Sequence, residues 1–197
     1  MGYDQDFYKM YQDYLNEPTV RAAHDWIFGI ARLNPHFQDV VDFGCGAFNE
    51  FNVYARPLRY LGVDVNAPVD DPLLVQADYR QVSDLAQLFG QALSPFAFVS
   101  LFSTEITATA EENYRFYERV FNQLPTVKSG LVSGFYYASK KDTNPIGETG
   151  GILSYQALED LEDVPSSSFT ERRIILPVPS KMFGPDVFEV WKFFDRK

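Results

Sequence analysis

Three stretches of this chain each end an apolar run in an aspartate, and two glycines follow the first aspartate closely. The stretches are Val40–Gly46 (VVDFGCG), Tyr60–Asp64 (YLGVD) and Leu73–Asp78 (LLVQAD). An apolar strand that breaks into a glycine turn brings bare backbone N–H groups close to a nucleotide-like ligand. A carboxylate at the end of such a strand can accept two hydrogen bonds from adjacent ribose hydroxyls. The pattern therefore indicates a binding edge for a nucleotide-like molecule.

Strands and helices alternate along most of the chain, which is typical of a doubly wound α/β sheet. We expect strands at Asp39–Phe43, Tyr60–Asp64, Leu73–Ala77, Phe96–Phe102 and Gly130–Tyr137, and helices near Glu50–Ala55, Val82–Phe89, Ala110–Leu124 and Ser154–Leu161. The connection between the last two predicted strands, Phe169–Val178 and Val187–Phe194, is too short for a crossover helix, so they should pair antiparallel. The sequence predicts a mostly parallel sheet of about seven strands in a three-layer α/β/α arrangement.

Two amphipathic helices are predicted before the first strand, over residues 4–16 and from Pro18 to Ala31. Pro18 suits the first position of the second helix, and Asn34-Pro35 ends its apolar stripe. On this pattern His24 belongs to the polar face of the helix. We expect residues 1–36 to form a helical cover or lid, and residues 37–197 to form the main domain.

Composition narrows the class of protein. The chain has 197 residues and a single cysteine, Cys45, which excludes an internal disulfide and a cysteine-rich zinc site and favours a reducing, cytoplasmic setting. No apolar stretch reaches the length of a membrane span, and the acidic start Met1–Asp6 is unlike a signal peptide. A net charge of −10 disfavours a nucleic-acid partner. Since no histidine, cysteine and carboxylate cluster has ligand spacing, we expect no metal.

The glycine turn resembles the first motif of the class I S-adenosylmethionine-dependent methyltransferases, which reads Asp-x-Gly-x-Gly-x-Gly. Asp42 opens the motif here, and Gly44, Cys45 and Gly46 follow it. The resemblance implies S-adenosyl-L-methionine as cofactor, with its methionine part above this turn and Asp42 organising that end. The family's third glycine corresponds to Phe48, so either the cofactor sits differently or the turn is recast.

The resemblance continues along the next strands. It implies that Asp64, followed by Val65, accepts the ribose hydroxyls, and that Asp78 receives the adenine amino group with Tyr79 beside the ring. The segment after the fourth strand is where many family members hold the substrate, and Glu105 there could orient or deprotonate an acceptor or cap the following helix. It lacks the Asn/Asp-Pro-Pro-aromatic run of enzymes that methylate base amino groups.

The main hypothesis is therefore a methyltransferase that acts on a small-molecule acceptor, whose reacting atom stays open, as does the oligomeric state. The alternative is a binding or scaffold protein that keeps the fold without turnover, which Phe48 and the lack of an assignable base would support. A nicotinamide-dependent oxidoreductase fits less well because Asn49 stands where its Gly-x-Gly-x-x-Gly pattern needs the third glycine.

Overall fold

A computed structural model describes residues 12–46, 58–89, 96–101, 110–139, 156–161, 165–181 and 184–197. Its helices are α2 (Pro18–Ala31) and α4 (Ala110–Gln123), with short 3-10 helices at Leu85–Phe89 and Leu158–Asp160. Its strands are β1 (Asp39–Phe43), β2 (Arg59–Asp64), β3 (Leu74–Gln76), β4 (Phe98–Leu101), β5 (Ser129–Tyr137), β6 (Gln156–Ala157), β7 (Phe169–Pro177) and β8 (Val187–Arg196).

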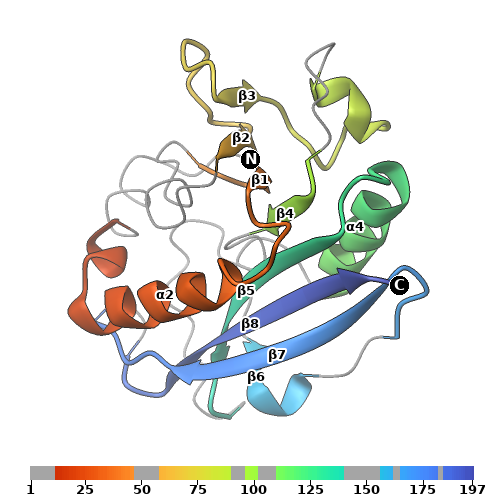
Figure 1. The fold of residues 1–197 in the computed structure, drawn as a ribbon. Helices are drawn as coiled ribbons and strands as arrows, with labels where there is room; N and C mark the ends of the chain where they lie inside the picture. Colours follow the sequence, from red (N-terminus) through yellow and green to blue (C-terminus); the bar gives the residue numbers. More distant parts are fainter. Residues whose placement is uncertain are drawn as a thin grey trace.

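The strands form one sheet in the order β3-β2-β1-β4-β5-β8-β7, with β6 attached to β5 (Figure 1). Strands β1 to β5 run parallel, and β8 pairs antiparallel with both β5 and β7. This confirms the predicted doubly wound, mostly parallel sheet with an antiparallel C-terminal hairpin. All nine residues of β5 are buried, so this strand lies within the core along its whole length.

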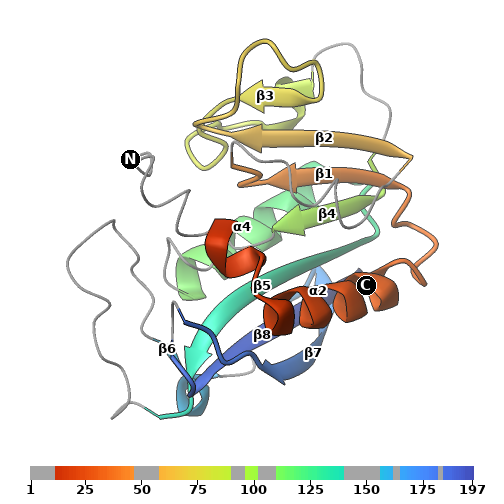
Figure 2. The same ribbon diagram turned by 90° about the vertical axis from the view of Figure 1, so that its left-hand side faces the viewer.

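Helices α2 and α4 cover opposite faces of this sheet (Figures 1 and 2). Because side chains alternate along a strand, Val40 of β1 packs toward α2 while Val41 packs toward α4. Helix α2 begins at Pro18 as predicted, and its buried stripe includes Ile27 and Phe28. The two cores are rich in aromatic rings: Phe28 meets Trp191 of β8 edge to face at 5.8 Å.

Two local predictions are wrong. Within the region expected to form a helix near Ser154–Leu161, Gln156 and Ala157 form β6, which pairs with Tyr136 and Tyr137 of β5, and a 3-10 helix follows over Leu158–Asp160. The helix expected over Val82–Phe89 is a 3-10 helix that begins at Leu85. Side-chain oxygens of Gln123 and Asp84 accept the N–H groups of Leu85 and Ala86, so contacts from outside the helix fix how it starts.

His24 is also placed differently from its prediction. Its side chain lies in the α2-side core and is fully buried, where its Nε2 lies 2.8 and 2.9 Å from the two carboxylate oxygens of Glu189. The same carboxylate accepts hydrogen bonds from the Trp191 indole, at 2.8 Å, and from the Tyr14 hydroxyl. A buried carboxylate is tolerated only when other groups donate hydrogen bonds to it. Because His24 belongs to α2 and Glu189 to β8, this network holds the helix against the strand.

Candidate functional site

The carboxyl ends of β1, β2 and β4 meet at one edge of the sheet, toward which the arrowheads point in Figure 2. In the register of the sheet, Asp42 of β1 lies between Gly62 of β2 and Ser100 of β4. Asp64 is the last residue of β2 and pairs with Gln76, the last residue of β3. The topology therefore brings the predicted carboxylates to a shared edge, which is where ligands bind in open α/β sheets.

The turn after β1 depends on its two glycines. Gly44 and Gly46 have φ angles of 79° and 64°, a backbone conformation that side chains disfavour. The Gly44 N–H donates to the Val63 carbonyl at 2.8 Å, which keeps the turn against β2. Beside it, Cys45 lies so close to Gly62 that a Cβ at position 62 would be 2.6 Å from the Cys45 sulfur. Gly62 thus leaves room for the turn to pack over β2.

Asp64 connects this turn to the end of β2. Its Oδ2 accepts the Gly46 N–H at 3.0 Å, and its Oδ1 accepts the Asn66 N–H at 2.8 Å. Burial raises the pKa of Asp64, the two backbone hydrogen bonds oppose that rise, and the charge of Asp78 adds to it. Each carboxylate oxygen has a second lone pair, so Asp64 can accept two further hydrogen bonds from a ligand.

Asp42 lies deeper, 2% exposed, with its Oδ2 accepting the Tyr60 hydroxyl at 2.9 Å. Burial raises its pKa to about 7, although hydrogen bonds from Ser100 and Tyr60 lower it, and the charge of Asp64 raises it further. Asp42 therefore changes charge near neutral pH. Burial likewise raises the pKa of the Cys45 thiol well above its usual range, which disfavours a nucleophilic thiolate at this position.

The two residues predicted after β3, Asp78 and Tyr79, lie in different places: one at the candidate edge of the sheet and one in the core. Asp78 is exposed and accepts the Arg80 N–H at 3.2 Å. Its negative charge contributes to the raised pKa of Asp64. The Tyr79 ring turns inward and is 8% exposed, packing against Phe43 and Phe116 at centroid distances of 5.3 and 5.1 Å. Burial raises the pKa of Tyr79 to about 12. The structure therefore places Asp78 at the edge and the Tyr79 ring in the α4-side core.

Of the other residues predicted for the site, the structure describes Val65. Val65 directly follows β2 and is 42% exposed. Glu105 and Phe48 lie outside the described residues. Among the residues that the structure describes, no three histidine, cysteine, aspartate or glutamate side chains gather as a metal site would need. No described helix has the length and apolar character to span a membrane.

Sequence reasoning missed Tyr60 and Gly62 as part of this edge. Both precede Asp64 on β2 by an even number of residues, so the alternation of a strand puts all three on one face. That spacing was readable from the sequence once Asp64 had been assigned to a strand end. Tyr60 supplies the hydroxyl that holds Asp42, and Gly62 the space that Cys45 fills.

No family model matches the chain, and no curated protein matches it in sequence. Solved structures do match. Magnesium protoporphyrin IX methyltransferase from Synechocystis PCC 6803, with bound SAH, has 10% identity and a TM-score of 0.58 over 98% of this chain and 95% of that one. The PH0226 protein from Pyrococcus horikoshii OT3 has 13% identity and a TM-score of 0.59, covering 98% and 100%.

A third structural neighbour, the small RNA methyltransferase HEN1, has 12% identity and a TM-score of 0.55, covering 90% of this chain and 25% of that one. At these identities the similarity concerns the fold. Together with the strand order and the antiparallel C-terminal hairpin, it shows that the chain has the class I methyltransferase fold.

Proposed function

We propose that this protein is an S-adenosylmethionine-dependent methyltransferase with a small-molecule acceptor. One observation carries the proposal: the N–H of Gly46, in the glycine turn after β1, is bonded to the carboxylate of Asp64 at the end of β2, on a class I methyltransferase sheet. This contact joins the two segments that the resemblance assigns to the methionine and ribose parts of the cofactor. The residues present fit that ligand.

In this proposal Asp64 accepts the ribose hydroxyls through its remaining lone pairs, with Val65 beside the adenosine. The Gly44-Cys45-Gly46 turn lies under the methionine part, whose position Asp42 helps to fix. Asp78 receives the adenine amino group. The bound cofactor supplies a methyl group on a sulfonium, which is already a strong donor. The protein's own task is then to orient the acceptor and exclude water, and positioning alone can supply roughly 7–11 kcal/mol.

The structural neighbours do not agree on an acceptor, because one enzyme is named for a porphyrin and another for small RNA. The net charge of the chain is the better guide to the class of acceptor. Net charge −10 opposes a polyanionic substrate, so we propose a small molecule, with Glu105 as the residue that orients or deprotonates it. We also propose a cytoplasmic setting. The division into a helical cover at residues 1–36 and a catalytic domain at 37–197 is part of the same proposal.

Calorimetric titration with S-adenosylmethionine and with S-adenosylhomocysteine tests the proposal directly. We expect both to bind, and Asp64→Ala to weaken binding at least about tenfold, since it removes charge-assisted hydrogen bonds of about 1.5–3 kcal/mol each. Asp70→Ala removes an exposed carboxylate from the connection between β2 and β3 and serves as the matched control. Absence of heat with either ligand at millimolar concentration would remove the proposal.

One observation favours the second candidate, a binding protein that keeps this fold without turnover. Both oxygens of Asp64 already accept backbone N–H groups, and the Tyr79 ring is turned into the core rather than toward a ligand. This candidate predicts negligible cofactor affinity together with a stable complex with another protein. Size-exclusion chromatography beside the titration separates the two, and fluorescence of added NADH checks for an oxidoreductase.

A further inference from the structure

A cavity of about 930 Å³ lies at the end of the parallel strands opposite the glycine turn. It is bordered by the last turn of α2 and the residues after it, by Ser129 at the start of β5, by the middle of β7 and by the last residues of β8. Ser129 pairs with Phe98, the first residue of β4, whereas the candidate cofactor edge lies beyond the strand's other end. The volume falls within the range of about 300–1,000 Å³ for small-molecule sites.

The charge around this cavity is opposite in sign to that of the chain. Among the described residues, its lining includes 5 of the chain's 17 lysines and arginines and 1 of its 27 aspartates and glutamates, in a chain of net charge −10. The positive residues are Lys128, Arg172, Arg173, Arg196 and Lys197, and the one acidic side chain among the described lining residues is Asp195. Such a local reversal attracts an anion to a protein that repels anions elsewhere.

Two of the five cations have side chains on the α4 side of the sheet, whereas Ile174 and Phe193 lie on the α2 side. Arg173 pairs with Glu171, and Arg196 donates to the carbonyls of Phe121, Leu124 and Val127 at the end of α4. Lys197 donates to the Ser166 carbonyl at 2.6 Å, and its charge acts on the Glu118 carboxylate, which bonds the Ser166 hydroxyl. Lys128 donates to the neutral backbone carbonyl of Pro125 at 3.3 Å.

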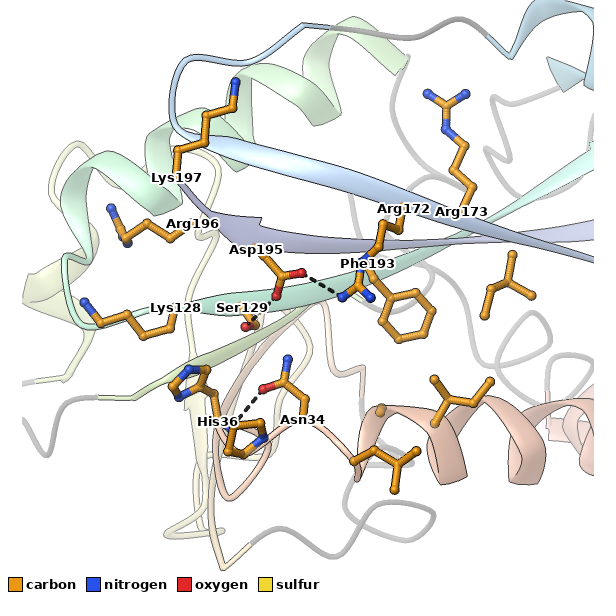
Figure 3. A pocket seen from close by; sticks show the side chains of 15 residues that line it. Asn34, His36, Lys128, Ser129, Arg172, Arg173, Phe193, Asp195, Arg196 and Lys197 are labelled. Carbon is orange, nitrogen blue, oxygen red and sulfur yellow. Dashed lines mark hydrogen bonds and ion pairs between the residues drawn. The ribbon is translucent and has the colours of Figure 1, made fainter.

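Arg172 is the cation best placed to hold a ligand. It contacts Asp195 through one terminal nitrogen at 2.7 Å, and its side chain is 72% exposed. A guanidinium has five N–H donors in a planar fork, so most of them remain for an anion. Figure 3 shows Arg172 reaching from β7 toward Asp195 inside the cavity, with Asn34 and His36 across from it.

The other part of the cavity is apolar. It is lined by Ile30 of α2, by Leu33 shortly after that helix, and by Ile174 and Phe193 of the hairpin. The Phe193 ring lies beside Arg172 (Figure 3). Leu33 is 83% exposed. An apolar surface next to an exposed guanidinium suits a ligand with an apolar body and an anionic head.

We propose that this cavity is a second ligand site, for an organic anion that carries a carboxylate or phosphate monoester on an apolar body. The head bonds the Arg172 guanidinium, Lys128 adds favourable potential, and the body lies against Phe193 and Ile174. The site is separate from the glycine turn, and the proposal does not depend on the proposed methyltransferase activity.

Calorimetry with three probes tests each part. We expect 1-naphthyl phosphate to bind with one-to-one stoichiometry, while 1-naphthylmethylammonium, which has the same body and opposite charge, and inorganic phosphate, which has the head alone, bind at least about tenfold more weakly. Binding of naphthyl phosphate should be unaffected by Asp64→Ala. This insensitivity distinguishes the cavity from the edge proposed for the cofactor.

Variants locate the site. Arg172→Gln should weaken naphthyl phosphate about tenfold, as expected for the loss of a charge-assisted hydrogen bond, and Lys128→Gln about two- to threefold with an effect that salt screens. Asp195→Asn should strengthen binding, because it removes the one acid and frees the guanidinium. Arg21→Gln, on the exposed side of α2, is the matched control. Equal binding of the cationic probe, or equal effects of Arg172→Gln and Arg21→Gln, would overturn the proposal.

Discussion

Replacing Asp42 by asparagine should change the stability of this protein in a way that depends strongly on pH. Burial raises the pKa of Asp42 from 3.8 to about 7, so the folded state prefers the protonated carboxyl. Stability is therefore unaffected by this group below pH 3.8 and falls as pH rises from there to about 7, where the folded state also ionises. The full loss is roughly 4 kcal/mol, at 1.36 kcal/mol for each unit of pKa difference.

Asparagine cannot ionise, so the variant escapes this loss. Integrating the same two pKa values gives a loss of roughly 2 kcal/mol at pH 5 and roughly 4 kcal/mol at pH 8. The stability of Asp42→Asn relative to the native protein should thus improve by roughly 2–3 kcal/mol between these two pH values. Any constant cost of fitting an amide beside Tyr60 and Ser100 cancels from the comparison.

Urea unfolding followed by the fluorescence of the buried Trp191, at fixed ionic strength, measures both free energies of unfolding. Asp39→Asn is the matched control on the same strand, because Arg59 lowers the pKa of Asp39. That carboxylate is ionised in both states at pH 5 and pH 8, so its replacement should have the same effect at the two values. A relative stability of Asp42→Asn that stays constant between them would refute the assignment of a buried carboxyl that titrates near neutrality.

Two other substitutions test the packing that positions the site. Glu189→Ala should destabilise the fold by about 3–5 kcal/mol, since it removes the buried acceptor of His24 and Trp191, and thermal unfolding of Glu189→Gln should show a smaller loss. Gly62→Ala should cost about 1–3 kcal/mol because its Cβ would lie 2.6 Å from the Cys45 sulfur, and adding Cys45→Ala should restore part of that loss in urea unfolding. Additive losses in this pair would contradict the proposed clash.

The features that the sequence predicts best are those set by local pattern. The apolar runs of the sequence predict β1, β2 and β3. Because these strands are parallel, their carboxyl ends lie at the same edge of the sheet, and Asp42 and Asp64 lie there together. The antiparallel hairpin followed from a connection too short to cross the sheet. Helix α2 was readable from Pro18 and its apolar stripe.

The features that escaped prediction depend on partners distant in the sequence. His24 looks like a polar-face residue until Glu189, 165 positions later, supplies its buried carboxylate. The residues of β6 carry no strong strand signal and become a strand because the end of β5 offers unpaired backbone there. The inward rotation of Tyr79 is decided by space beside Phe43 and Phe116, which come from different elements.

The position of β8 has a consequence for how the protein is made. This strand follows every other described element in the chain, yet it lies between β5 and β7 and pairs with nearly the whole length of each. During translation, α2 and β5 leave the ribosome long before β8. Until then the sheet is incomplete, and His24 has no contact with Glu189 of β8. We expect the nascent chain to remain without its full core until β8 is released, and then to fold slowly, as chains dominated by such distant contacts do.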